Sequence, residues 1–195
     1  MDDRSAGELL SLVESVGNEL RGLEAKPALE CLELRYPDIE SALTWLLDHD
    51  RADDALRVVV ALGAFWTAAG RITEGRTSFD RSLAAVTTTS KLVARALFEG
   101  GLLAFWQGDD AAAASLHERS LALARALGAR TETALALTGL ARIALRTDNH
   151  RAEVLSEAAL STVQGRMIVL GAQMRCISSG WLRRCAAISR PLADI

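Results

Sequence analysis

Apolar residues recur along most of the chain at spacings of three and four positions, which is the period of an amphipathic α-helix. No stretch alternates β-branched and polar residues as a half-buried strand would. The pattern predicts a helix from Pro37 to about Asp48, because the fixed φ of proline suits a first helical turn. The further predicted helices span residues 52–69, 73–86, 91–107, 109–127, 131–146 and 149–163.

Short polar or glycine-containing turns separate these predicted helices. Gly70, Gly108 and Gly128 each follow an apolar run, where a residue in the left-handed conformation ends a helix at little steric cost. A polar run at residues 48–51 has no apolar face and is expected to break the first helix. The turns are short enough to make successive helices antiparallel.

The helical segment repeats itself. A shift of 38 residues places Gly63 on Gly101, Gly70 on Gly108 and Phe79 on His117. A further shift of 40 residues gives a third copy, whose second helix fits better with one residue fewer. A partial copy that contains the Pro37 helix precedes them, and it resembles the outer helix of a capping unit.

The residues kept by the repeat are small ones at helix crossings. Gly63, Gly101 and Ala141 would let two helices approach closely, opposite Ala113 and Ala152, while large leucines fill the remaining space. Stacked pairs of this kind predict an all-α fold, a right-handed α-solenoid of antiparallel helix pairs with the first helices lining a concave groove. We expect an acidic helical cap in residues 1–50, three helix pairs in residues 51–163, and a divergent basic helix or tail in residues 164–195.

These residues resemble the tetratricopeptide repeat: Leu62-Gly63, the stretch 102–109 and the phrase 120–128 are its best local matches. The period of 38 to 40 residues and the segment 38–47 resemble the repeat region of large bacterial LuxR/MalT-like ATP-dependent transcriptional regulators. The resemblance covers about residues 36–163. It implies a module of bacterial signalling or transcriptional control that senses a protein, a peptide or a small inducer.

Motifs for catalysis or cofactor binding are absent from the sequence. It has no G-x-x-x-x-G-K-[ST] loop for nucleotide phosphates, no G-x-S-x-G, no H-E-x-x-H, and no recognisable helix-turn-helix after residue 163. His117 and His150 align with aromatic slots of the repeat, which favours packing over metal binding. His49 lies between two aspartates, where a polar loop explains it better than a cation site. We therefore expect no enzyme, no cofactor and no metal.

One face of the first helices is the candidate binding groove. Its mixture of apolar anchors and arginine forks suits an extended peptide or an acidic ligand. In the competing interpretation the aromatic residues Phe98, Phe105 and Trp106 are core between repeats, and the arginines belong to a solvated face or to local ion pairs. The candidates are Arg57, Val60, Ala64, Thr67, Arg95, Phe98, Leu102, Phe105, Leu135, Thr138, Arg142 and Leu145.

Composition and charge predict the cellular compartment, and they show that charge is unevenly distributed along the chain. The 195 residues carry a net charge of −3, with three cysteines that form no C-x-x-C pair. The longest apolar runs fall short of a membrane span, and the start of the chain does not look like a secretory signal, so a cytoplasmic protein is expected. Residues 1–50 hold 12 acids and 4 bases, whereas residues 158–195 hold one acid and five arginines.

The basic C-terminal segment has two interpretations. It either docks on a membrane, a nucleic acid or a partner helix, or it is a degenerate segment or a divergent capping helix. Docking on nucleic acid would make the protein a nucleic-acid-associated regulator. The few arginines of the segment are a small footprint for nucleic acid, so we favour the second interpretation. An open-ended helical array with an apolar end face could also form a homo-oligomer.

Overall fold

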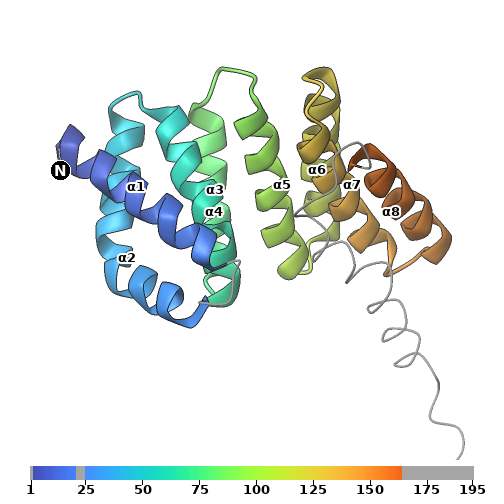
Figure 1. The fold of residues 1–195 in the computed structure, drawn as a ribbon, viewed down its shortest axis with the longest axis horizontal. Coiled ribbons are helices and arrows are strands. Elements are labelled where there is room, and N and C mark those ends of the chain that lie inside the picture. The colour runs from blue at the N-terminus through green and yellow to red at the C-terminus, as the bar shows by residue number, and fades with distance from the viewer. Residues whose placement is uncertain (1, 21–24, 164–195) are drawn as a thin grey trace, which may run out of the picture.

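The computed structural model describes residues 2–20 and 25–163 (Figure 1). This part of the chain contains eight α-helices and no strand. The helices are α1 (Asp3–Glu19), α2 (Ala25–Asp48), α3 (Ala52–Ala68), α4 (Ile72–Ala85), α5 (Lys91–Trp106), α6 (Asp110–Ala126), α7 (Arg130–Ala144) and α8 (Asn149–Val163). The expectation of an all-α protein is confirmed for these residues.

Helices α3 to α8 begin and end within two residues of the predicted bounds. Their boundaries are local signals. Gly70, Gly108 and Gly128 have φ values of 71°, 82° and 61°, as a left-handed helix end requires. In each case the following N–H donates to a carbonyl of the last helical turn, at 2.9 Å for Arg71 to Trp66, 3.0 Å for Asp109 to Ala104 and 2.8 Å for Ala129 to Ala124.

The predicted start at Pro37 is wrong, because α2 runs through this residue from Ala25. A proline inside a helix removes one hydrogen bond and costs roughly 3 kcal/mol. Leu32, Tyr36 and Ile39 lie on either side of Pro37 and are all buried, and each large apolar side chain gains about 1.5–3 kcal/mol from burial. Tertiary packing therefore outweighs the local penalty. In Figure 1 the first turns of α2 run across the lower edge and the rest of the helix turns upward.

The helices pack in sequence. Each contacts the next one along the chain, and α1, α3, α5 and α7 also contact one another in series. We call these four helices the odd-numbered row. Figure 1 shows the helices following one another along the longest axis. The row carries the predicted groove residues, since they lie on α3, α5 and α7, with Leu145 as the residue that caps the end of α7.

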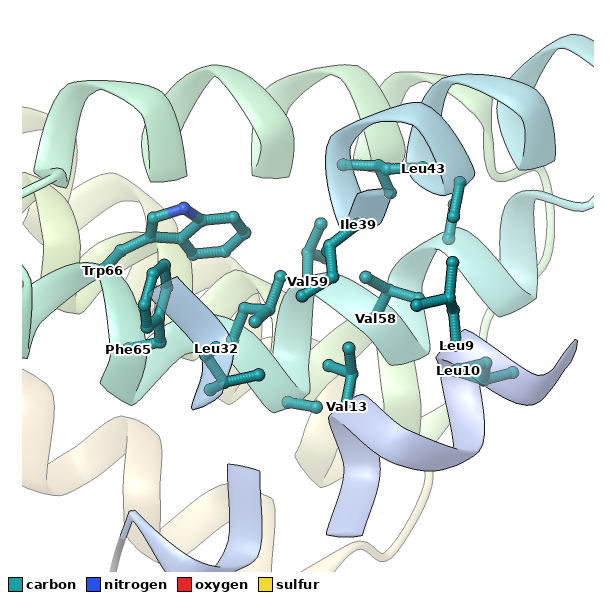
Figure 2. Close-up of a cluster of buried hydrophobic side chains, with 14 of the residues drawn as sticks. Leu9, Leu10, Val13, Leu32, Ile39, Leu43, Val58, Val59, Phe65 and Trp66 are labelled. Carbon is teal, nitrogen blue, oxygen red and sulfur yellow. The ribbon is translucent and has the colours of Figure 1, made fainter. Parts of the chain in front are cut away.

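The largest core cluster lies at the N-terminal end, where α1, α2 and α3 meet (Figure 2). Leu9 and Val13 of α1, Ile39 of α2 and Val58 of α3 are buried there. A Cβ at Gly17 would stand 2.5 Å from the carbonyl oxygen of Ala61, so α1 crosses α3 at a distance that only glycine permits. The cap helices therefore pack directly on the first helix pair, while a division of the chain at residue 50 stays a prediction.

A single polar contact orients the aromatic side of this core. The indole Nε1 of Trp66 donates a hydrogen bond to the hydroxyl of Tyr36 at 3.0 Å. Burial raises the pKa of Tyr36 to about 12, so its hydroxyl stays protonated. Arg71 lies over the Tyr36 ring at 4.6 Å and closes the cluster from outside.

Candidate functional site

The structure sorts the predicted groove residues by exposure. The buried ones are Phe98, Phe105, Leu135 and Thr138. The partly exposed ones are Val60, Ala64, Thr67, Arg95, Leu102, Arg142 and Leu145, and Arg57 is exposed. Of the predicted groove residues on α5 and at α7, those that a partner could reach are therefore two arginines and two leucines.

The three aromatic residues of α5 differ in their surroundings. Phe98 and Phe105 are buried, as the core interpretation predicts, and Phe98 packs at a tilt against His117 with ring centres 5.5 Å apart. Trp106 is 50% exposed, so placing it in the core is wrong. It is the last residue of its helix, and its ring lies edge-on to the Phe105 ring with ring centres 5.4 Å apart.

Arg57 on α3 is neutralised from two directions. Its guanidinium donates to both carboxylate oxygens of Glu14 on α1, at 2.8 and 2.9 Å, and to Asp54 on its own helix at 3.1 Å. The hydrogen bonds to Glu14 are the largest cause that raises the pKa of Arg57. This arginine joins α1 to α3, as the local ion-pair interpretation predicts.

Arg95 on α5 forms an ion pair with one carboxylate. Its Nε donates to Glu99, one turn along the helix, at 2.8 Å. Glu99 is only 6% exposed, and a Cβ at Gly63 of α3 would stand 3.0 Å from its Oε2. The small residue at Gly63 therefore makes room for a carboxylate between α3 and α5. Sequence reasoning missed Glu99, although a lone acid in an apolar run, four residues after an arginine, is a usable signal.

Arg142 on α7 has a different environment. Its guanidinium makes no hydrogen bond or ion pair within the part of the chain that the structure describes, residues 2–20 and 25–163. Burial lowers the pKa of Arg142, and the negative charge of Glu99 opposes that shift. Arginine stays protonated in proteins, so a positive charge lies partly buried here.

His117 on α6 lies near the positive charge of Arg142. It is fully buried, and a Cβ at either Gly101 of α5 or Gly139 of α7 would stand 2.6 Å from its ring. Neither ring nitrogen has a hydrogen-bond partner among the described residues. Burial first, and the charge of Arg142 second, lower the pKa of His117 to about 4, which keeps the ring neutral at pH 7. The packing interpretation of His117 is confirmed, and Gly139 is a slot residue that the repeat alignment did not find.

The other two histidines do not form a site. His150 is exposed at the start of α8, so its assignment to an aromatic slot is wrong; the shortened third copy places Ser156 at that position instead. The Nδ1–H of His49 donates a hydrogen bond to the Trp45 carbonyl at 2.8 Å, and the His49 ring stacks on the Trp45 ring. Across residues 2–20 and 25–163 no three histidine, cysteine or acidic side chains converge as metal ligands.

A surface hollow of about 320 Å³ lies between α1 and α2, away from the predicted groove. It is lined by Ser5, Glu8, Leu9, Leu12, Arg35 and Asp38. Arg35 is already paired with Asp38 at 3.0 Å, so the lining is internally neutralised.

None of the described helices is long and apolar enough to cross a membrane. The expectations for the basic C-terminal segment fall on residues 164–195, which lie outside the described residues.

A scan against protein-family models finds no match to this chain, and a search of curated proteins finds no similar sequence. The case for a function therefore depends on the residues of the odd-numbered row.

Proposed function

We propose that the chain is a non-enzymatic interaction module whose odd-numbered row binds an extended peptide segment of a partner protein. In this proposal the helix pairs form a right-handed, tetratricopeptide-like solenoid, and the module acts in bacterial signalling or transcriptional control in the cytoplasm. The support for the fold is the serial contact of α1, α3, α5 and α7, and the support for the setting is the repeat resemblance.

The observation that carries the binding function is the alternation of exposed charge and apolar surface along the row. Arg95 and Leu102 on α5, and Arg142 and Leu145 on α7, are all partly exposed. An arginine and a leucine on each of two neighbouring helices, two turns apart on α5 and one turn apart at the end of α7, can bind a polar group and an apolar side chain in turn.

The spacing of the helices favours an extended ligand. Packed helices lie about 8–10 Å apart, so the way from α3 across α5 to α7 covers about 20 Å. An extended peptide advances about 3.3 Å per residue and would need roughly six residues to span that distance. A small inducer would reach one or two of the helices.

The test is selection of peptides by the full chain. A phage-displayed library of random twelve-residue peptides is selected on residues 1–195, and the enriched peptides are synthesised with fluorescein and measured by fluorescence anisotropy. Leu102→Gln and Leu145→Gln remove apolar contacts on the row, and each is expected to weaken binding at least about fivefold, the loss of roughly 1 kcal/mol of apolar contact.

The matched control is Leu34→Gln on α2, because Leu34 is 81% exposed and lies off the row. This variant is expected to bind the peptides as the unchanged chain does. Circular dichroism melts establish that each variant is folded. The proposed function is wrong if no peptide is enriched, or if the enriched peptides bind the Leu102 and Leu145 variants as tightly as the unchanged chain.

A further inference from the structure

The three arginines among the predicted groove residues differ in how many carboxylates they already bind. Arg57 binds two, from Glu14 and Asp54, and Arg95 binds one, from Glu99. Arg142 has no carboxylate within 4.0 Å among residues 2–20 and 25–163. The internal neutralisation of the row therefore decreases from α3 to α7.

The buried position of Arg142 makes this difference significant. A partly desolvated charge costs free energy unless an opposite charge and hydrogen bonds compensate it. The negative charge that acts on Arg142 is that of Glu99, whose carboxylate already accepts a hydrogen bond from Arg95 at 2.8 Å. His117 is neutral and contributes no negative charge. The guanidinium groups of Arg95 and Arg142 thus both act on the one carboxylate of Glu99.

The surroundings of Arg142 also leave its donors available. The hydroxyl of Thr138, one turn before it, donates to the carbonyl of Ala134 at 2.9 Å, so it is engaged within its own helix. Leu145, one turn after it, is partly exposed and apolar. A guanidinium can offer two parallel N–H donors to a carboxylate, and this geometry gives the strongest neutralisation that a ligand could supply.

We propose that Arg142, beside the Arg95–Glu99 pair, forms a subsite that binds one carboxylate of the peptide ligand, with the neighbouring apolar side chain of the peptide on Leu145. This inference rests on the proposed function and adds its chemical class: the partner segment is acidic at one position and apolar beside it. The carboxylate comes either from an aspartate or glutamate side chain or from the C-terminus of the peptide.

The experiment uses the enriched peptides in three synthetic forms: the parent with a free C-terminus, a form with Asp and Glu replaced by Asn and Gln, and a form with an amidated C-terminus. Fluorescence anisotropy gives the Kd of each for the unchanged chain and for Arg142→Met. Loss of the recognised carboxylate is expected to weaken binding to the unchanged chain about tenfold, the usual size of one charge-assisted hydrogen-bonded pair. The same loss is expected to change the Kd for Arg142→Met less than twofold.

Three controls separate ligand binding from a structural role. Arg119→Met removes an exposed arginine of α6 and is expected to keep the full tenfold carboxylate dependence. Arg142→Lys keeps the positive charge but loses the two parallel N–H donors of the guanidinium, and it is expected to keep part of the carboxylate dependence. Arg142→Met is expected to melt at or above the temperature of the unchanged chain, because it keeps the apolar stem and removes a partly desolvated charge, whereas a structural role would lower the melting temperature.

Two outcomes overturn the inference, and they can be told apart. In the first outcome the peptides bind the row, as a loss of affinity in Leu102→Gln shows, but removing their carboxylates leaves the Kd unchanged or weakens binding to Arg142→Met as much as to the unchanged chain. The carboxylate subsite is then wrong and the proposed function stands. If no peptide binds the row, both fail together.

Discussion

The two ends of the odd-numbered row are built differently. Where α1, α2 and α3 meet, large apolar side chains such as Phe65 and Leu56 are fully buried and the arginine facing α1 is neutralised by acids. Between α5, α6 and α7 large side chains such as Phe98 and Phe105 are buried among alanines and glycines, and the buried groups also include Glu99 and His117. We therefore expect the first region to contribute most of the stability, because the second contains polar groups whose burial costs free energy.

The largest expected effect lies in the apolar region. Phe65→Ala removes a fully buried ring that packs against Tyr36 with centres 5.3 Å apart. The change is expected to lower the free energy of unfolding by about 3–5 kcal/mol. Urea denaturation followed by circular dichroism measures it. A loss below about 1 kcal/mol would contradict the view that this region dominates the stability of the chain.

The next effect is a pH dependence in the polar region. Because the pKa of His117 is lowered from 6.5 to about 4 by folding, the unfolded chain binds a proton that the folded chain does not. The stability that neutral His117 contributes is present above about pH 6.5 and is lost as the pH falls towards 4. The loss between pH 7 and pH 4.5 is expected to be about 2–3 kcal/mol.

The variant that tests this pH dependence is His117→Leu, whose stability should change less between the two pH values. His150→Gln, at an exposed histidine, serves as the matched control and should follow the unchanged chain. Equal slopes for the unchanged chain and His117→Leu would show that other groups carry the pH dependence.

The glycine slot around His117 gives the third prediction. Gly139→Ala places a methyl group against the rigid imidazole and is expected to destabilise the chain by about 1–3 kcal/mol, despite the better helix propensity of alanine. Gly7→Ala, in α1 with open space around its Cβ, gains the same propensity without a clash and is expected to stabilise by about 0.5–1 kcal/mol. Thermal melts of the two variants should shift in opposite directions; shifts of the same sign would contradict the close packing of α6 against α7.

The smallest effect is expected at the ion pair between α1 and α3. Arg57 and Glu14 are 44% and 37% exposed, so water screens their attraction. Glu14→Gln is expected to cost less than about 1 kcal/mol, and less still at high salt. A larger loss in a urea titration would mean that the pair is a main support of the cap rather than a minor one.

The sequence predicts the features of this fold that depend on local interactions better than those that depend on contacts between distant residues. The ends of α3 to α8 depend on glycine in a left-handed conformation and on short polar turns, which are local, and they are predicted within two residues. The course of α2 through Pro37 depends on burial against other helices, so a local signal predicts the wrong start. The sequence therefore predicts a helix correctly where its local preferences agree with its tertiary packing.

The candidate site was predictable only in part. Periodicity placed Arg95, Leu102 and Arg142 on one row of helices, because helical spacing is regular. It did not find that Gly139 forms a slot for His117 or that Glu99 pairs with Arg95, because these contacts depend on side-chain packing within and between helices. Nor could it show that Trp106, at the end of α5, is half exposed, since exposure depends on tertiary packing.

The serial packing of the helices has a consequence for how the chain folds. Its principal contacts join helices one or two places apart along the chain, so few loops of long sequence separation must close before native contacts form. Low contact order of this kind is associated with fast folding. It also allows unfolding to begin at one end and proceed helix by helix, so amide protons of α8 should exchange with solvent earlier than those of α3.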